Sequence, residues 1–186
     1  METPNVLGKG STNIKSPNAL GGWASKYKKK IISWDVAPPE EYFRQLFRVS
    51  KKAIIWGGNY FDLPPQRNFI IWRKPNIPGQ FSMSQIEYAW TNIQGNAKIF
   101  EYPSTRDETS GKFHPTEKPI ALYKWLLQQY ATPGDLILDT HVGSASSLIA
   151  CDDMGFNYVG FEIDPEYYQQ AKARIEEFNA QYRFNI

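Results

Sequence analysis

The pattern of apolar and polar positions predicts an α/β fold, and it is clearest over residues 134–165. The apolar run over residues 136–138 predicts a buried parallel strand, which ends at Asp139. Gly143 and the small residues after it predict a tight turn that opens a helix, and a second strand is predicted over residues 158–163. The order is strand, turn, helix and strand, which is half of an α/β domain.

Two features of this stretch indicate a ligand. Gly143 and the small side chains at 144–147 let the backbone approach a ligand where a helix begins. Glu162 lies at the end of the second predicted strand, about twenty residues after the turn, where nucleotide-binding units carry a ribose-binding carboxylate. The alternative is a purely structural βαβ unit with the same spacing.

The rest of the chain extends the same pattern. A helix that begins at Pro38 has an apolar face and is expected to pack on a sheet. Further helices are expected from Pro119 to just before Pro133 and from Pro165 onward, the last one covering the sheet. The other predicted segments are strands over residues 53–56 and 69–72, a helix or strand over 86–90, an extended stretch over 98–102 and a polar loop over 103–112.

Asn59, Tyr60 and Phe61 follow the strand predicted over residues 53–56. Because α/β sheets bind ligands beyond the carboxyl ends of their strands, these three residues are a candidate rim of a functional site. The alternative is that the two rings fill the core.

Charge changes sign along the chain, although the net charge is only +2. Residues 1–30 carry six Lys against one Glu, and residues 114–186 carry five basic against ten acidic residues. A basic first part fits a polyanionic partner, or it is simply a solvated segment. Residues 1–30 have too few apolar residues to form a packed element, so a basic flexible arm is expected over residues 1–33, followed by a single domain over residues 34–186.

Several classes of protein are disfavoured by composition. The chain has no apolar run long enough to span a membrane and no apolar secretory core at its N-terminus, so an intracellular location is expected. Two His and one Cys provide no metal-ligand cluster. Cys151 falls in the helix after the turn, where a buried inert thiol is expected rather than a nucleophile.

Three motifs occur in a characteristic order. They are His-Pro-Thr-Glu-Lys-Pro at 114–119, Asp-Thr-His-Val-Gly-Ser at 139–144 and Gly-Phe-Glu-Ile-Asp at 160–164. In this order and spacing the chain resembles the β-type, circularly permuted amino-group DNA methyltransferases, which use S-adenosylmethionine. The resemblance extends upstream through Trp34-Asp35, residues 41–43 and residues 54–61, so it covers roughly residues 34–180.

The resemblance implies a Rossmann-like methyltransferase fold and assigns cofactor roles to particular residues. The turn beneath S-adenosylmethionine is formed by Asp139, His141, Gly143, Ser144 and Ala145, and Ser146 and Ser147 open the helix that faces it. Glu162 would bind the ribose hydroxyls. The segment beside the methionine end of the cofactor comprises Thr116, Lys118 and Pro119, and the Lys118 ammonium is expected to pair with its carboxylate unless it is a solvated lysine at the helix start.

The chain departs from the family pattern in its turn and in its catalytic motif. The family's turn usually reads Asp-Pro-Phe-x-Gly-Ser-Gly, whereas this chain has Thr140, His141 and Ala145 at the second, third and seventh places. Thr140 and His141 resemble a variant typical of phage-type members. The family's turn usually has glycine at the position of Ala145, whose methyl group is expected to crowd the approaching backbone and weaken cofactor binding. The catalytic Asp-Pro-Pro-Tyr, whose acid and proline carbonyl accept hydrogen bonds from the target amino group while its ring stacks on the flipped base, does not occur in the sequence. In relatives it precedes the Trp-Asp segment, so a catalytic strand is expected to be missing at the N-terminus.

The expected function is therefore methyl transfer to N6 of adenine in DNA, with residues 114–186 holding the cofactor and residues 57–113 facing DNA. Adenine is preferred because the Trp-Gly-Gly-Asn-Tyr-Phe region resembles phage-type adenine enzymes. The alternatives are cytosine-N4 transfer or a catalytically incomplete relative that binds cofactor or DNA, as a homodimer or with a completing subunit. A cytoplasmic location in a bacterium, with a bacterial or phage gene, is expected.

Overall fold

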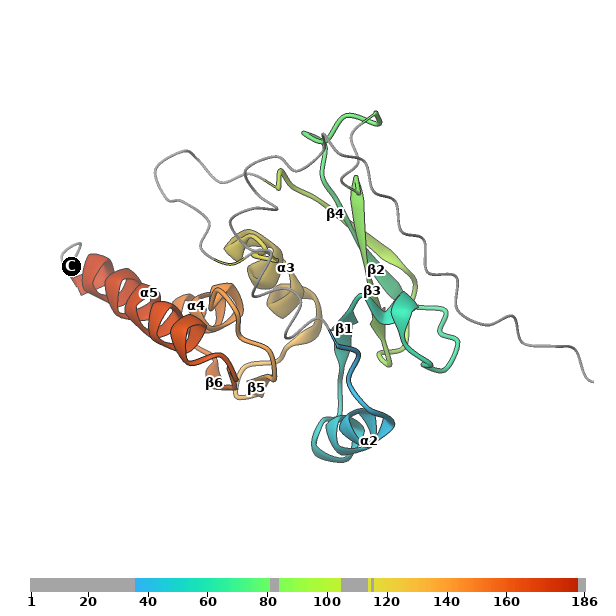
Figure 1. Ribbon diagram of the computed structural model, residues 1–186, viewed down its shortest axis with the longest axis horizontal. Helices are drawn as coiled ribbons and strands as arrows, with labels where there is room; N and C mark the ends of the chain where they lie inside the picture. Colours follow the sequence, from blue (N-terminus) through green and yellow to red (C-terminus); the bar gives the residue numbers. More distant parts are fainter. Residues whose placement is uncertain (1–35, 81–83, 105–113, 115, 184–186) are drawn as a thin grey trace, which may run out of the picture. The chain divides into compact units, whose positions relative to one another are not determined.

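The computed structural model describes residues 36–80, 84–104, 114 and 116–183 (Figure 1). The chain forms two units, Met1–Ala37 and Pro38–Ile186. The predicted arm over residues 1–33, the Trp34-Asp35 pair and residues 105–112 of the predicted polar loop lie outside the described residues. The structure below is that of the second unit.

The elements of this unit follow the predicted order, with strands also in its middle region. The helices are α2 (Glu40–Val49), α3 (Ile120–Tyr130), α4 (Ser146–Asp153) and α5 (Pro165–Arg183), with a short 3-10 helix η1 (Gly58–Tyr60). The strands are β1 (Ile54–Trp56), β2 (Phe69–Arg73), β3 (Ile86–Thr91), β4 (Lys98–Glu101), β5 (Leu136–Asp139) and β6 (Asn157–Gly160).

The described strands form two sheets. One is four-stranded with the order β1-β3-β2-β4, in which β3 runs antiparallel to β1 and β2, while β4 runs parallel to β2. The other is the parallel pair β5-β6, in which Leu138 lies opposite Val159. Among the described strands, β1, β4, β5 and β6 each have one neighbour, so one edge of each of these strands is unpaired.

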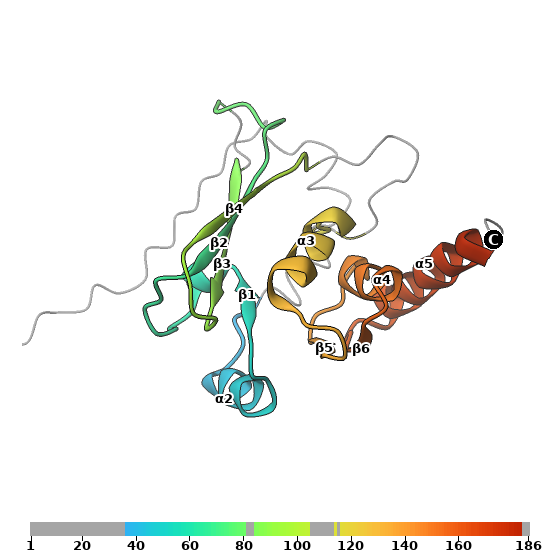
Figure 2. The ribbon, with the colours of Figure 1, turned by 180° about the vertical axis from the view of Figure 1, so that it is seen from behind.

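The C-terminal part, comprising β5, α4, β6 and α5, has a core of small side chains. Val142, Ala145, Leu148 and Ala171 are all buried and pack together. Small residues allow close approach, and α4 and α5 lie side by side (Figure 2). A Cβ atom added to Gly160 would stand only 2.6 Å from Cγ2 of Val142. The glycine therefore lets the end of β6 pack directly against the turn before α4.

Adjacent residues of helix α3 contact different elements, the four-stranded sheet on one side and α4 on the other. Leu126 lies in a cluster with Ile70 of β2 and Ala89 of β3, whereas Leu127 packs against Ala150 and Cys151 of α4. Successive helical residues point about 100° apart, so adjacent side chains reach different partners. Cys151 is a buried free thiol, and burial raises its pKa to about 12. No helix among the described residues is both long and apolar enough to cross a membrane.

Two details of the predicted elements are wrong. Strand β5 is not buried, because Leu136 is 65% exposed and Leu138 is 37% exposed. Only the opposite face, which carries Ile137, is covered by helices within the described residues. Strand β6 ends at Gly160 rather than Ile163, because Gly160 lies opposite Asp139, the last residue of its partner strand β5. The ambiguous segment at 86–90 is the strand β3.

Candidate functional site

The turn between β5 and α4 is organised by the carboxylate of Asp139. Its Oδ1 accepts a hydrogen bond from the N–H of His141 at 2.9 Å, and its Oδ2 accepts one from the hydroxyl of Ser147. One carboxylate thus joins the start of the turn to the first residues of the helix. The backbone carbonyl of Asp139 also accepts a hydrogen bond from the N–H of Phe161 at 2.9 Å, which joins the start of the turn to the end of β6.

Glu162 joins the same two loops from the other side. Its Oε2 accepts the N–H of Gly143 at 2.8 Å, and its Oε1 accepts the N–H of Asp164 at 2.9 Å. Two half-buried carboxylates therefore stand at the carboxyl ends of neighbouring parallel strands, Asp139 as the last residue of β5 and Glu162 two residues after β6. Each oxygen of an ionised carboxylate has a second lone pair, so both groups retain acceptor capacity for hydroxyl donors.

Ala145 adopts a left-handed backbone conformation with φ of 62°. An L-residue in this region costs about 1–2 kcal/mol relative to the right-handed region, which explains why glycine is favoured at such a position. The residue is fully buried, and its methyl group packs in the cluster with Val142, Leu148 and Ala171. The methyl group thus faces the core and does not crowd the open side of the turn, so the departure from glycine costs strain rather than space.

His114 covers the turn. A Cβ atom added to Gly143 would lie 3.2 Å from the His114 ring, and the ring meets Tyr167 of α5 edge-on with 4.4 Å between centroids. Its Nδ1 accepts the N–H of Thr116 at 3.3 Å. Burial lowers the pKa of His114, and Lys118 acts in the same direction, while Glu162 and Asp164 oppose the shift. The imidazole is therefore neutral at pH 7.

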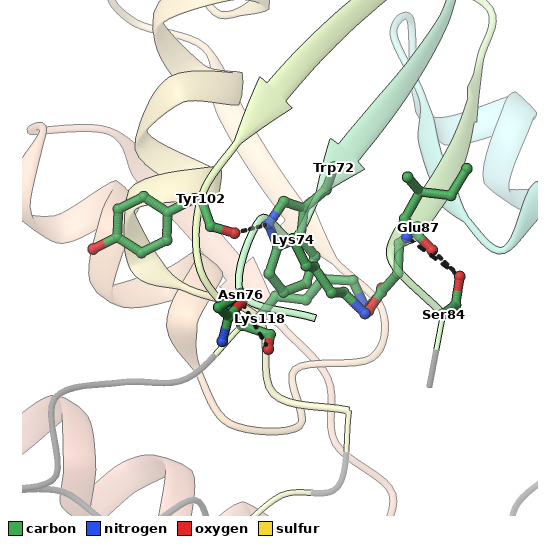
Figure 3. A network of polar contacts seen from close by, with 9 residues as sticks. Trp72, Lys74, Asn76, Ser84, Glu87, Tyr102 and Lys118 are labelled. Carbon is green, nitrogen blue, oxygen red and sulfur yellow. Dashed lines mark hydrogen bonds and ion pairs between the residues drawn. The ribbon is translucent and has the colours of Figure 1, made fainter. Parts of the chain in front are cut away.

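Lys118 belongs to a network with Glu87 of β3 and with Lys74, which directly follows β2 (Figure 3). Its Nζ lies 3.1 Å from Oε2 of Glu87, and Nζ of Lys74 lies 2.7 Å from Oε1 of the same carboxylate. The Lys118 ammonium also stands 5.3 Å from the centroid of the Trp56 ring. Burial raises the pKa of Glu87, but the two lysines outweigh it and hold the pKa below its usual value. Lys118 is thus a paired, largely buried lysine and not a solvated one.

Comparison with known proteins identifies the family of the chain. A family model described as DNA methylase, that of the N6 and N4 methyltransferases, matches residues 23–173. The chain belongs to this family.

Two curated proteins similar to this chain are type II methyltransferases. The chain is 29% identical over 150 residues to M2.MboI of Moraxella bovis, which is 79% of this chain and 49% of that protein. It is 39% identical over 69 residues to M.HpaI of Haemophilus parainfluenzae, or 37% of this chain and 22% of that one. The chain therefore spans about half the length of the first relative and less of the second.

A solved structure confirms the predicted fold class. The complex of M1.HpyAVI with S-adenosylmethionine matches with a TM-score of 0.55 and 22% identity, covering 82% of this chain and 95% of that one. The two chains share the Rossmann-like fold of the DNA methyltransferases. The predicted cofactor of the family, S-adenosylmethionine, is the ligand of that structure.

The candidate rim lies in and just after η1. Asn59 and Tyr60 are exposed, and the Tyr60 side chain is 82% exposed. Phe61 instead packs on Phe43 of α2 with 5.1 Å between ring centroids, so its ring fills space between elements. The neighbouring Tyr42 has its hydroxyl 2.7 Å from that of Thr140 in the turn. Helix α2 therefore contacts both the rim and the turn.

Sequence reasoning missed three residues that contact the predicted ones directly or through one another. Glu87 lies in β3 and Lys74 directly follows β2, in segments with no motif, and the register of β2 against β3 brings the two side chains together beside Lys118. Arg174 of α5 contacts the buried residues Ser144 and Ser146, whose hydroxyl oxygens lie 3.1 Å apart. Helical spacing gave no signal for Arg174, because an arginine on a long exposed helix is ordinarily solvated.

Proposed function

We propose that this chain binds S-adenosylmethionine at the turn after β5 and serves methyl transfer to N6 of adenine in DNA. The observation that carries the proposal is the pair of carboxylates, Asp139 and Glu162, at the carboxyl ends of neighbouring parallel strands. Both are fixed by backbone N–H groups while keeping free lone pairs. In α/β folds this edge of the sheet is where nucleotides bind.

The residues around Glu162 fit an adenosine group. Phe161 is 59% exposed and Ile163 is 91% exposed, so an apolar surface flanks a half-buried acceptor for ribose hydroxyls. An adenine ring placed on these side chains would cover apolar surface that is otherwise in water. The bound cofactor supplies a methyl group activated by a positively charged sulfur.

The Lys118 network supports binding of the methionine end. Two ammonium groups, from Lys74 and Lys118, share the single carboxylate of Glu87, so the network has an excess positive charge. That charge favours an anionic group such as the cofactor carboxylate. Thr116 is exposed two residues before Lys118, and Pro119 directly precedes α3. Both are proposed to lie beside the methionine end of the cofactor.

The target base is proposed to meet the exposed Asn59 and Tyr60. An exposed ring at the end of a strand offers a stacking surface for an unpaired base, and the amide of Asn59 offers a donor and an acceptor to a base edge. Adenine is proposed over cytosine because of the resemblance of residues 56–61 to phage-type adenine enzymes.

Catalysis is proposed to need a further strand that ends in Asp-Pro-Pro-Tyr, from another polypeptide segment or a completing subunit. The described strands β1 and β5 each have an unpaired edge, and Leu136 and Leu138 present apolar surface beside that edge. Unpaired strand edges and exposed leucines favour association with another strand. A module that binds cofactor and DNA without catalysis is the second candidate, favoured by the absence of Asp-Pro-Pro-Tyr from the sequence.

The test compares two proteins in methyl transfer from labelled S-adenosylmethionine to unmethylated DNA. One is the 186-residue chain, and the other is the chain extended by an apolar strand ending in Asp-Pro-Pro-Tyr. We expect cofactor binding by both and transfer only by the extended chain, with N6-methyladenine as the product on nucleoside analysis. The matched control is an extension ending in Ala-Pro-Pro-Ala, which should transfer nothing.

The outcomes separate the candidates. If the product is N4-methylcytosine, the target base is cytosine and the proposal of adenine is wrong. Transfer by the 186-residue chain alone would contradict the need for a further strand. Cofactor binding by both proteins without any transfer would support the non-catalytic module.

A further inference from the structure

Arg174 connects the two motif segments of the C-terminal part. Its Nη1 donates hydrogen bonds to the backbone carbonyl of Ser144, at 2.5 Å, and to Oγ of Ser146, at 3.1 Å. Its Nη2 lies 3.3 Å from Oε1 of Glu117 in the segment before α3. One side chain of α5 thus contacts both the turn that follows Asp139 and the segment that begins at His114.

These contacts are shielded from water. The Arg174 side chain is 11% exposed and that of Glu117 is 4% exposed, while Ser144 and Ser146 are buried. A charged pair is taken out of water only when its geometry and hydrogen bonds are good, because desolvation of both charges is costly. The planar guanidinium presents its donors in a fixed arrangement, so its partners are held at defined positions relative to one another.

The turn needs such a restraint. Gly143 and Ala145 both have positive φ, of 53° and 62°, and Ala145 is not glycine. A strained backbone persists only where surrounding contacts hold it. Arg174 binds the carbonyl of Ser144, the residue between these two, and the hydroxyl of Ser146, the residue after them.

We propose that Arg174 is a positioning residue for the cofactor. Through Ser144, Ser146 and Glu117 it fixes the turn against the His114 segment, so that Asp139 and Glu162 present their oxygens in the arrangement that binds adenosine. This inference rests on the proposed cofactor binding for its effect on affinity, but the restraint of the turn is independent of any ligand.

The experiment uses three variants of the 186-residue chain. Arg174→Lys keeps the charge but loses the planar donors. The double variant Arg174→Met with Glu117→Met removes both buried charges, so that neither remains unpaired and the fold is preserved. Lys172→Met is the matched control, because Lys172 lies on the same helix in an exposed ion pair with Glu176.

Two readouts are measured well below the melting temperature. Hydrogen exchange of the amides at 143–147 in the free chain should be faster by about tenfold in Arg174→Lys and in the double variant, and unchanged in Lys172→Met. The dissociation constant for S-adenosylmethionine should rise by about tenfold or more in the same two variants, because small displacements of positioning groups are costly.

Unchanged exchange at 143–147 in the double variant would overturn the restraint. Faster exchange with unchanged cofactor affinity would overturn the positioning role. If the unmodified chain binds no S-adenosylmethionine, the proposed function fails, and the exchange rates still decide whether Arg174 restrains the turn.

Discussion

The C-terminal part and the four-stranded sheet are stabilised by different kinds of contact. In the C-terminal part, carboxylates and an arginine bind backbone groups directly, as Glu162 does with Gly143 and Asp164. In the four-stranded sheet, large rings fill the interior: Trp72 is 1% exposed, and Phe47 of α2 packs on Trp90 of β3. The first region holds polar atoms in place through hydrogen bonds, whereas the second is filled by packed rings.

The two regions meet through pairs of adjacent residues. Leu126 packs on the four-stranded sheet and Leu127 on α4. Similarly, Glu117 pairs with Arg174 of α5, while Lys118 pairs with Glu87 of β3. The difference between the regions can therefore be tested by changing one member of each pair.

The largest effect is expected from Leu126→Ala and Leu127→Ala. Each removes a buried leucine from a different cluster, at a cost of about 2–5 kcal/mol in the free energy of unfolding. Hydrogen exchange should show lost protection in β2 and β3 for Leu126→Ala and in α4 for Leu127→Ala. If both variants lose protection at the same amides, the two leucines do not stabilise separate regions.

A smaller loss is expected from Glu87→Gln. The change leaves Lys74 and Lys118 without their shared anion in a largely buried place, which should cost about 2–3 kcal/mol in urea unfolding. Arg73→Gln is the control, because it breaks an exposed ion pair with Glu101 on neighbouring strands and should change stability by less than about 0.5 kcal/mol. Equal losses in both variants would show that the network adds nothing beyond a surface pair.

Gly160→Ala tests the close packing of the C-terminal part. Its new Cβ atom would stand 2.6 Å from a methyl carbon of Val142 and 2.7 Å from one of Leu148. Overpacking of this kind costs about 1–3 kcal/mol. Gly155→Ala is the comparison without a steric clash, since nothing lies within 4 Å of its added Cβ. Any loss of stability in that variant comes from backbone strain at its φ of +74°. A Gly160→Ala variant as stable as the unmodified chain would mean that β6 can move away from the turn.

The smallest effect concerns pH. Burial lowers the pKa of His114 in the folded chain, so the unfolded chain binds this proton more readily. The contribution to stability is complete above the unfolded pKa of about 6.5 and is lost as the pH falls through the folded value. His114→Asn should therefore reduce the slope of unfolding free energy against pH between about pH 7 and 5, by less than about 1 kcal/mol in total. Identical slopes would show that the ring is solvated.

The sequence allowed the C-terminal part to be predicted because its contacts are local. Strand, turn, helix and strand are consecutive, and the polar atoms that hold them come from short motifs such as those containing Asp139 and Glu162. Such motifs combine turn residues and hydrogen-bond acceptors at fixed spacing, and the apolar periodicity of the flanking segments places them between a strand and a helix.

The four-stranded sheet could not be predicted to the same degree. The order β1-β3-β2-β4 depends on pairing between distant segments, and the segment of β3 has no clear alternation, with Ala89, Trp90 and Thr91 buried in succession. Glu87 reaches Lys118 only through that topology. The exposure of Leu136 and Leu138 was missed because an apolar run looks the same whether or not a neighbour covers it.

The most direct test of the account is binding of S-adenosylmethionine, measured by calorimetry on the 186-residue chain and on two variants with thermal unfolding as a folding check. Glu162→Gln replaces one of the oxygens that hold the turn and should weaken binding by about tenfold or more. Glu166→Gln makes the same chemical change at an exposed residue of α5 and should leave affinity unchanged. Equal affinity in all three proteins, or no binding by the unmodified chain, would contradict the placement of the cofactor at this turn.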